Sequence, residues 1–271
     1  METLNTKSGN IPISYLFKPS ANPECTVVFL HGFPFDKSTW LKQLCALPDT
    51  VQGIAYDIRG FGDSSTDHRF FSINIFAKDL IRLIEDLNLS NCILCGISMG
   101  GYIALRASEL SPETFKGLIL CDTNCAADSN ESKIKRFDSI ELIHANKKAE
   151  FTEGFLTNVF LENTLLNSTD TVEFLRNVIL TTQNETICAT QLAIASRTDT
   201  SHVLSEIKVP TLIIRDEFDK LMLEEQTMHL HKGIFESELV IIPDSGHLPN
   251  LDKPDVFNLA INSFLHKHFL S

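Results

Sequence analysis

Short apolar runs alternate along most of the chain with stretches of helical spacing. The runs are rich in β-branched and aromatic residues, which is typical of buried strands. They predict strands at residues 11–17, 26–30, 51–56, 92–95, 116–121, 209–215 and 238–243. Apolar residues at helical spacing predict helices at residues 37–47, 72–87, 102–110 and 255–269. Strands that alternate with helices in this way indicate an α/β fold with a doubly wound, mostly parallel sheet covered on both faces.

The alternation stops between residues 122 and 208. This segment contains no proline and one glycine, Gly154, and its apolar residues recur at helical spacing. Because the strand pattern resumes directly afterwards, we expect an inserted helical cap at residues 124–205, with residues 1–123 and 206–271 forming the core. A second, unrelated helical domain is the alternative.

Composition and charge narrow the range of partners. The chain has 271 residues, of which 43% are hydrophobic, and a formal net charge of -12. An acidic chain of this kind argues against binding to nucleic acid or to an anionic membrane surface. The seven cysteines show no metal-type spacing, and the N-terminus shows no signal pattern. We therefore expect a cytoplasmic protein with free thiols and, in the absence of a phosphate loop or a metal motif, no cofactor and no bound metal.

The most informative motif is Gly96-Ile97-Ser98-Met99-Gly100, which lies between a predicted strand and a predicted helix. A Gly-x-Ser-x-Gly sequence at such a junction is the pattern of a nucleophile elbow. The sharp turn holds the serine in a strained conformation, and large residues two positions away on either side would clash. The motif therefore indicates that Ser98 is a nucleophile exposed above the sheet edge.

A serine hydroxyl requires a base to remove its proton, and histidine oriented by a carboxylate is suited to that task. The sequence after the insertion provides His247, in a loop after a predicted strand, and Asp216 and Asp219, directly after the strand before it. Asp122 also follows a strand and is a further candidate for the acid. In a doubly wound sheet these loops meet at one edge, so the side chains can converge with Ser98.

Several motifs together resemble the α/β-hydrolase superfamily over nearly the whole chain. They are His31-Gly32-Phe33-Pro34, Asp57-x-Arg59-Gly60-x-Gly62-x-Ser64, the elbow, and Gly246-His247-Leu248-Pro249-Asn250. Within the superfamily the chain is most similar to small carboxylesterases and 3-oxoadipate enol-lactonases. The resemblance implies a triad of Ser98, Asp219 and His247, because the family spacing favours Asp219 as the acid. It also implies an oxyanion hole formed by the backbone N–H groups of Phe33 and Met99.

The resemblance implies a serine hydrolase that cleaves a small carboxylic ester or lactone through an acyl-enzyme on Ser98. Hydrolysis of a carbon–carbon bond in a β-diketone-like ring-cleavage product is an alternative, as is cofactor-free peroxidation of halides. A non-enzymatic receptor for a small ligand would use the same scaffold. The expected partner is a small-molecule ester or lactone.

Four aromatic side chains are candidates for the substrate pocket. Trp40 belongs to the predicted helix at 37–47, and Phe155, Phe160 and Phe174 belong to the predicted cap. Of the remaining polar residues, His31 is expected to shape its loop by hydrogen bonds. Asp57 and Arg59 are expected to brace the loop that follows the predicted strand at residues 51–56.

Overall fold

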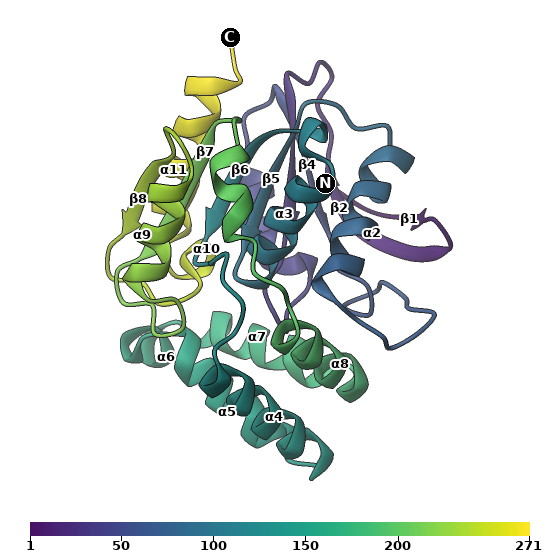
Figure 1. Ribbon diagram of the computed structural model, residues 1–271, viewed down its shortest axis with the longest axis vertical. Helices are drawn as coiled ribbons and strands as arrows, with labels where there is room; N and C mark the ends of the chain where they lie inside the picture. Colours follow the sequence, from purple (N-terminus) through teal and green to yellow (C-terminus); the bar gives the residue numbers. More distant parts are fainter.

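Eight strands form one sheet in the computed structural model, which describes all residues 1–271. The strand order is β1-β2-β4-β3-β5-β6-β7-β8. The strands are β1 (Glu2–Ser8), β2 (Ile11–Lys18), β3 (Cys25–Leu30), β4 (Val51–Tyr56), β5 (Cys92–Ile97), β6 (Phe115–Cys121), β7 (Thr211–Asp216) and β8 (Glu238–Ile242). β2 pairs antiparallel with both β1 and β4, and all other pairs are parallel. The predicted mostly parallel α/β sheet is therefore confirmed (Figure 1).

Helices cover both faces of the sheet. α2 (Ile73–Asp86) packs against α3 (Met99–Leu110) on one face, whereas α1 (Leu41–Ala46) packs against α11 (Pro254–His268) on the other. The two faces can be followed from adjacent residues of β3, which point to opposite sides. Leu30 lies against Gly100 of α3, and Phe29 packs on Trp40, which in turn contacts Phe257 of α11.

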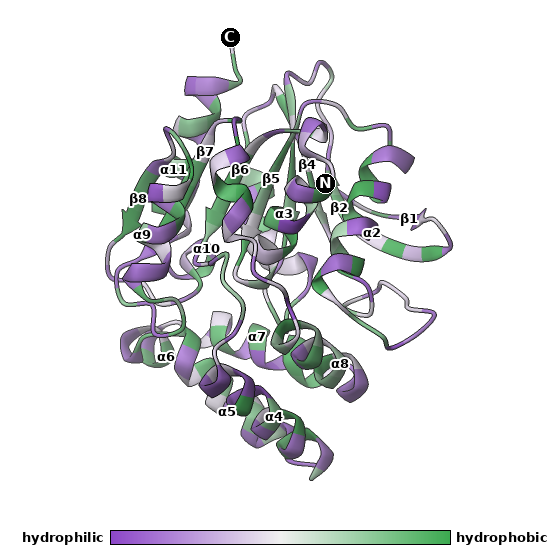
Figure 2. Cartoon of the chain, in the orientation of Figure 1, coloured by the Kyte–Doolittle hydropathy of each residue, from purple (hydrophilic) through white to green (hydrophobic).

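The central strands are buried on both faces, and this explains their continuous apolar sequences. Every residue of β3 and of β5 is buried. Figure 2 shows the central strands mainly in the colour of hydrophobic residues, with hydrophilic residues on the outer helices. The parallel strands β3, β5, β6 and β7 all end at the same edge, so the loops that follow them lie together there.

Five helices lie between β6 and β7 and cover this edge, below the sheet in Figure 1. They are α4 (Asn130–His144), α5 (Lys148–Val159), α6 (Glu162–Asn167), α7 (Thr169–Thr181) and α8 (Asn184–Ala195), followed by the 3-10 helix η3 (Ser201–Glu206). α4 packs against α8, and α5 packs against α7. The segment thus contains helices and no strand, as its spacing predicts.

Some elements differ from the sequence prediction. β1 was not predicted, because its residues are mostly polar and exposed, as in an edge strand. The predicted helix at 37–47 is a 3-10 helix, η1 (Lys37–Trp40), capped by Asp36 and followed by α1. The small helix α10 (Pro249–Asp252) was also missed. α9 (Glu224–Gly233) completes the fold between β7 and β8.

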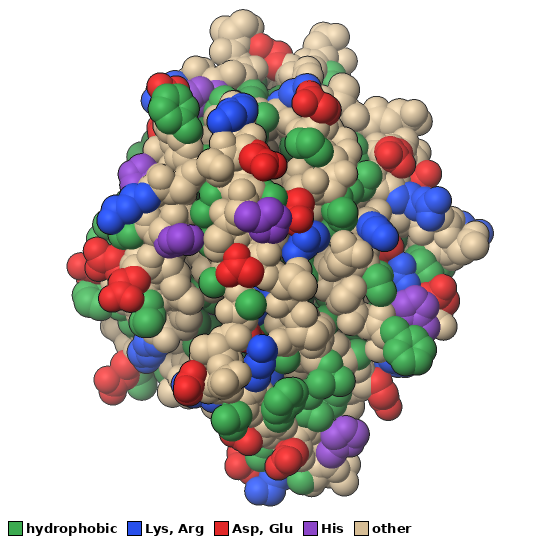
Figure 3. All heavy atoms as spheres, in the orientation of Figure 1, with side chains coloured by type: hydrophobic (Ala, Val, Ile, Leu, Met, Phe, Trp, Pro, Cys, Tyr) green, Lys and Arg blue, Asp and Glu red, His purple; other side chains and the backbone are tan.

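The apolar residues of α4 do not form a buried face. Ile134 and Phe137 are exposed, and only Ile143 of this helix is buried. Figure 3 shows hydrophobic atoms gathered at the lower end of the molecule, over the region of α4. α4 instead contacts α8 partly through polar side chains, since Arg136 donates to Gln191. No helix of the protein has both the length and the apolar character that crossing a membrane requires.

Candidate active site

Ser98 occupies the turn between β5 and α3. Its backbone has φ 52° and ψ −115°, a strained conformation for a residue other than glycine. Three short contacts hold the turn in place. The Ser98 N–H donates to the Cys121 carbonyl at 2.9 Å, and the Ser98 carbonyl accepts from Gly101 N at 3.0 Å and from Thr123 Oγ1 at 2.8 Å. The strained turn that the motif predicts is therefore present.

The glycines on either side of Ser98 are required by close backbone contacts. A Cβ atom at Gly96 would lie 2.4 Å from the carbonyl oxygen of Gly100. A Cβ atom at Gly100 would lie 2.2 Å from the carbonyl oxygen of Leu30, at the end of β3. Both distances are far below van der Waals contact, so neither position accepts a side chain without a movement of the backbone.

The loop after β3 lies directly against the turn. A Cβ atom at Gly32 would be 3.5 Å from Cβ of Ser98, so the adjacent Phe33 N–H is close to the nucleophile. The Phe33 N–H makes no hydrogen bond within the protein. Met99 is the first residue of α3, a position where the backbone N–H has no partner in its own helix. Both N–H groups therefore lie beside the Ser98 turn without a hydrogen-bond partner in the protein.

His31 fixes the shape of this loop. Its buried ring accepts from Ile58 N–H through Nε2 at 3.0 Å and donates from Nδ1 to the Gly32 carbonyl at 3.0 Å. These two contacts define a neutral ring, and burial lowers the pKa of His31 to about 4. The expected structural role of His31 agrees with this geometry.

His247 and Asp219 are in direct contact. The Nδ1 atom of His247 lies 2.7 Å from Oδ2 of Asp219, and both side chains are buried. The other carboxylate oxygen of Asp219 accepts from the backbone N–H groups of Leu221 at 2.7 Å and Met222 at 3.1 Å. Burial alone would raise the pKa of Asp219, but the His247 ring and these two donors together keep it below its ordinary value. Asp219 is thus an ionised acceptor, and Nε2 of His247 is left free to accept a proton.

The other two candidate acids point elsewhere. Asp216 accepts from Ser245 Oγ at 2.7 Å, and Asp122 accepts from the backbone N–H of Asp216 at 2.8 Å. Burial raises the pKa of both Asp122 and Asp216 well above the ordinary value. Neither carboxyl group forms a hydrogen bond with His247, so Asp219 is the one of the three that contacts the imidazole.

Ser98 and His247 line the same pocket, which has a volume of about 280 Å³. No hydrogen bond joins Ser98 Oγ to His247, and such contacts are often long in the absence of substrate. The pocket lies between the sheet edge and the cap. Its other lining residues are Phe33, Tyr102, Ser132, Lys135, Arg136, Ser139, Phe151, Phe155, Asn158, Gln191, Ile194, Lys220, Leu221 and Met222.

Of the four aromatic candidates for the pocket, only Phe155 lines it. Trp40 is fully buried in the core between Phe29 and Phe257, on the far face of the sheet from α3. Phe160 is buried where the cap meets the Gly246 loop, and Phe174 is 38% exposed on α7. The assignments of Trp40, Phe160 and Phe174 to the pocket are therefore wrong. Helical spacing identifies cap residues but does not show which of them turn toward Ser98.

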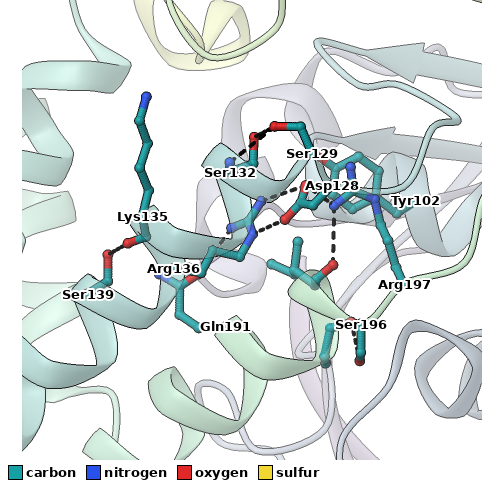
Figure 4. Close-up of polar contacts among 12 residues, drawn as sticks. Tyr102, Asp128, Ser129, Ser132, Lys135, Arg136, Ser139, Gln191, Ser196 and Arg197 are labelled. Atoms are coloured by element: carbon teal, nitrogen blue, oxygen red, sulfur yellow. Dashed lines mark hydrogen bonds and ion pairs between the residues drawn. The ribbon is translucent and has the colours of Figure 1, made fainter.

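The polar part of the pocket wall was not predicted. Figure 4 shows Arg136 between Asp128 and Gln191, with Arg197 on the other side of Asp128. Arg136 comes from α4 and Gln191 from α8, so the sequence offers no local signal that joins them. Arg197 also stacks on the ring of Tyr102, with its guanidinium carbon 4.1 Å from the ring centre. The expected loop-bracing network exists as well, with Asp57 bound by Lys37 at 2.6 Å and Arg59 by Asp79 at 2.7 Å.

Comparison with known proteins agrees with this architecture. A thermophilic esterase from Thermogutta terrifontis, solved with malate bound, superimposes with a TM-score of 0.89 at 30% identity, covering 98% of this chain and 99% of that one. The 3-oxoadipate enol-lactonase 2 of Acinetobacter baylyi is 25% identical over 89% of this chain and 88% of its own. The karrikin insensitive 2 receptor CA of Petunia hybrida is 27% identical over 90% and 92%. The family described as the alpha/beta hydrolase fold matches residues 26–254, and the chain belongs to that family.

Proposed function

We propose that the protein is a serine hydrolase that cleaves a small carboxylic ester or lactone through an acyl-enzyme on Ser98. The observation that carries the proposal is the contact between an ionised Asp219 and His247, which lines the same pocket as Ser98. Family membership and the similarity to an esterase and a lactonase support hydrolase chemistry.

In the first half of the reaction, Ser98 Oγ forms a bond with the substrate carbonyl carbon while its proton passes to Nε2 of His247. The bond from that carbon to the alkoxy oxygen then breaks, and the leaving oxygen takes the proton from Nε2. In a lactone the leaving alcohol stays attached as part of the acyl chain. The His247 ring carries a positive charge in between, which the Asp219 carboxylate stabilises.

In the second half, a water molecule loses a proton to Nε2 of His247 and its oxygen bonds to the acyl carbon. The bond from the acyl carbon to Ser98 Oγ breaks, and the proton returns to Oγ. The carbonyl oxygen becomes negative in both halves and is placed to accept from the Phe33 and Met99 N–H groups. The loss of one such donor typically slows a reaction by about 100- to 1000-fold.

In this proposal, the helices of residues 124–205 act as a cap that selects the substrate. Phe151 and Phe155 of α5 and Ile194 of α8 line the pocket together with Ser98. The cap also holds the loop of His247 in place, because the Val159 carbonyl accepts from the backbone N–H of His247 at 2.8 Å. Apolar walls of this kind exclude water from the reacting groups and limit the size of the acyl chain.

The proposal is tested by covalent labelling and by turnover. A fluorophosphonate should label Ser98, and the protein should hydrolyse p-nitrophenyl acetate and butyrate. Ser98→Ala should lose both properties. Ser108→Ala, on the same helix and outside the pocket lining, is the matched control and should keep them. Labelling at a different residue, with unchanged turnover in Ser98→Ala, would overturn the assignment. Labelling of Ser98 without turnover would favour a receptor over an enzyme.

A further inference from the structure

The charged side chains that line the pocket are all basic. Lys135 and Arg136 come from α4, Lys220 comes from the loop after β7, and no aspartate or glutamate lines the pocket. The chain as a whole contains 35 acidic residues and 23 lysines and arginines. The pocket therefore has the opposite sign to the rest of the protein, and a solvated surface of average composition does not account for that.

The pocket lining also contains two chemically distinct groups of side chains. Apolar side chains such as Phe33, Phe155 and Met222 are shared between the sheet edge and the cap. The three cations are accompanied by uncharged polar side chains from the cap, namely Ser132, Ser139, Asn158 and Gln191. A simple aliphatic ester would use only the apolar side chains and would leave the polar ones without a partner.

Arg136 is held rigidly in this wall. Its guanidinium is paired with Asp128, and Nη1 donates to Gln191 Oε1 at 3.0 Å (Figure 4). Asp128 is also paired with Arg197, so one carboxylate serves two guanidinium groups and an excess positive charge remains. A fixed arginine loses little freedom when it binds an anion, which favours recognition.

The two lysines carry uncompensated charge at the same pocket. In Figure 4 the ammonium group of Lys135 extends away from the Arg136 cluster, and no hydrogen bond or ion pair joins it to the residues drawn. The Lys220 Nζ atom donates to the Thr157 carbonyl at 3.4 Å, which is a neutral acceptor. Neither lysine has an acidic partner within 4 Å, so both remain available to an anion.

We infer that the substrate of Ser98 carries a carboxylate several atoms away from the carbonyl that is attacked, and that Lys135, Arg136 and Lys220 select for it. The inference rests on the proposed ester or lactone hydrolysis and adds the charge class of the substrate. The acyl carbonyl lies between Ser98 and the free N–H groups, and the carboxylate faces α4. The cations also attract an anionic substrate toward the pocket, because a charged cleft concentrates ions of the opposite sign.

The inference is tested with two esters of equal size. Monoethyl glutarate carries a carboxylate, and ethyl 4-carbamoylbutanoate replaces it with a neutral amide. Hydrolysis of each is followed by pH-stat titration at pH 7.5, and the quantity compared is the ratio of their kcat/KM values. Lys135→Gln/Lys220→Gln should lower this ratio about tenfold, since an exposed ion pair contributes a few-fold each. Lys135→Arg/Lys220→Arg should restore it, and 0.5 M NaCl should lower it in the wild type.

Lys133→Gln is the matched control, because Lys133 lies on α4 but not in the pocket lining, and it should leave the ratio unchanged. A ratio that does not change in the double glutamine variant overturns the inference while ester hydrolysis by Ser98 stands. If neither ester is hydrolysed, the proposed function fails, and calorimetric binding of glutarate then decides the inference separately. Binding that weakens about tenfold in the double variant supports it. Equal binding, or no binding to the wild type, overturns it.

Discussion

The imidazole Nδ1 of His247 lies 2.7 Å from Oδ2 of Asp219, in a contact that joins two loops 28 residues apart in the chain. The loops follow the neighbouring strands β7 and β8, which is why the two side chains meet. Asp219 does not depend on His247 for its position, because its second oxygen is held by the N–H groups of Leu221 and Met222. The carboxylate is therefore fixed before a substrate binds.

The first prediction concerns this carboxylate. Asp219→Asn should lower kcat for p-nitrophenyl butyrate by as much as about 10,000-fold, the loss found when a triad aspartate is replaced by asparagine. The amide would favour the wrong tautomer of His247. Fluorophosphonate labelling should slow in parallel, while the folded structure is kept.

Asp216→Asn and Asp122→Asn are the comparison variants. Both carboxyl groups are buried near the site, yet they bind Ser245 and a backbone N–H and not the imidazole. We expect smaller losses of kcat from either change, together with some loss of stability. If Asp122→Asn proves the most damaging of the three, the orienting acid follows β6 and the assignment of Asp219 is wrong.

The second prediction concerns the glycine after the nucleophile. Gly100→Ala would place Cβ within 2.2 Å of the Leu30 carbonyl oxygen, so the turn at Ser98 must shift. We expect a loss of esterase activity of at least 100-fold, because a displacement of about 1 Å at a reacting group has that effect. The midpoint of urea unfolding should also fall.

Gly154→Ala provides a control in which the same substitution acts in the opposite direction. Gly154 lies inside α5, and a Cβ atom there would meet nothing within 4 Å. Alanine is favoured over glycine in a helix by roughly 0.5–1 kcal/mol, so this variant should be slightly more stable. A stable and fully active Gly100→Ala variant would show that the elbow tolerates a side chain.

The sequence alone predicts the parts of the protein that depend on local pattern. The parallel strands are buried on both faces and so appear as continuous apolar runs, as in β3 and β5. The elbow is recognised because the turn restricts residue types at Gly96 and Gly100. His247 is found because it follows a strand whose edge is shared with Ser98.

The parts that depend on tertiary contacts could not be predicted in this way. β1 is stabilised by pairing with β2 and not by apolar side chains, so its sequence is polar. Trp40 was assigned to the pocket although it packs in the core, because no sequence pattern reports the orientation of a short 3-10 helix. The basic part of the pocket lining forms only where α4, α8 and the loop after β7 come together in the fold. These segments are far apart in the chain, so the sequence does not predict that they are neighbours.

The third prediction concerns the size of the pocket. Phe155 packs against Phe33 and Phe35, with ring centres 6.0 and 5.8 Å away, and it lines the pocket beside Ser98. Phe155→Ala should therefore enlarge the pocket and raise kcat/KM for p-nitrophenyl octanoate relative to the acetate. Phe174→Ala, at an exposed site on α7, should leave the order of chain lengths unchanged. If both variants keep the wild-type order of chain lengths, the acyl chain does not lie against Phe155.

The fourth prediction concerns the dependence of stability on pH. Burial lowers the pKa of His31 to about 4, whereas an unfolded histidine titrates near pH 6.5. Between these pH values the unfolded chain binds a proton at His31 that the folded protein does not bind. The stabilisation that results from the neutral His31 ring is therefore complete above pH 6.5 and is lost as the pH falls toward 4. The loss is on the order of 3 kcal/mol of the free energy of unfolding.

His31→Gln removes this titration and keeps a side chain that can accept from Ile58 N–H. The difference in the free energy of unfolding between the wild type and His31→Gln should therefore be largest above pH 6.5 and should shrink toward pH 4. Urea unfolding from pH 4 to 8 measures this difference. Burial raises the pKa of Asp57 to about 6 despite the contact with Lys37, so Asp57 makes the stability change with pH in the opposite direction. Because both proteins contain Asp57, its effect cancels in the comparison. His202→Gln is the control for replacing an exposed histidine. A constant difference across this range would mean that the pKa of His31 is the same in the folded and the unfolded protein, and a neutral buried ring that accepts from Ile58 N–H down to pH 4 would then be excluded.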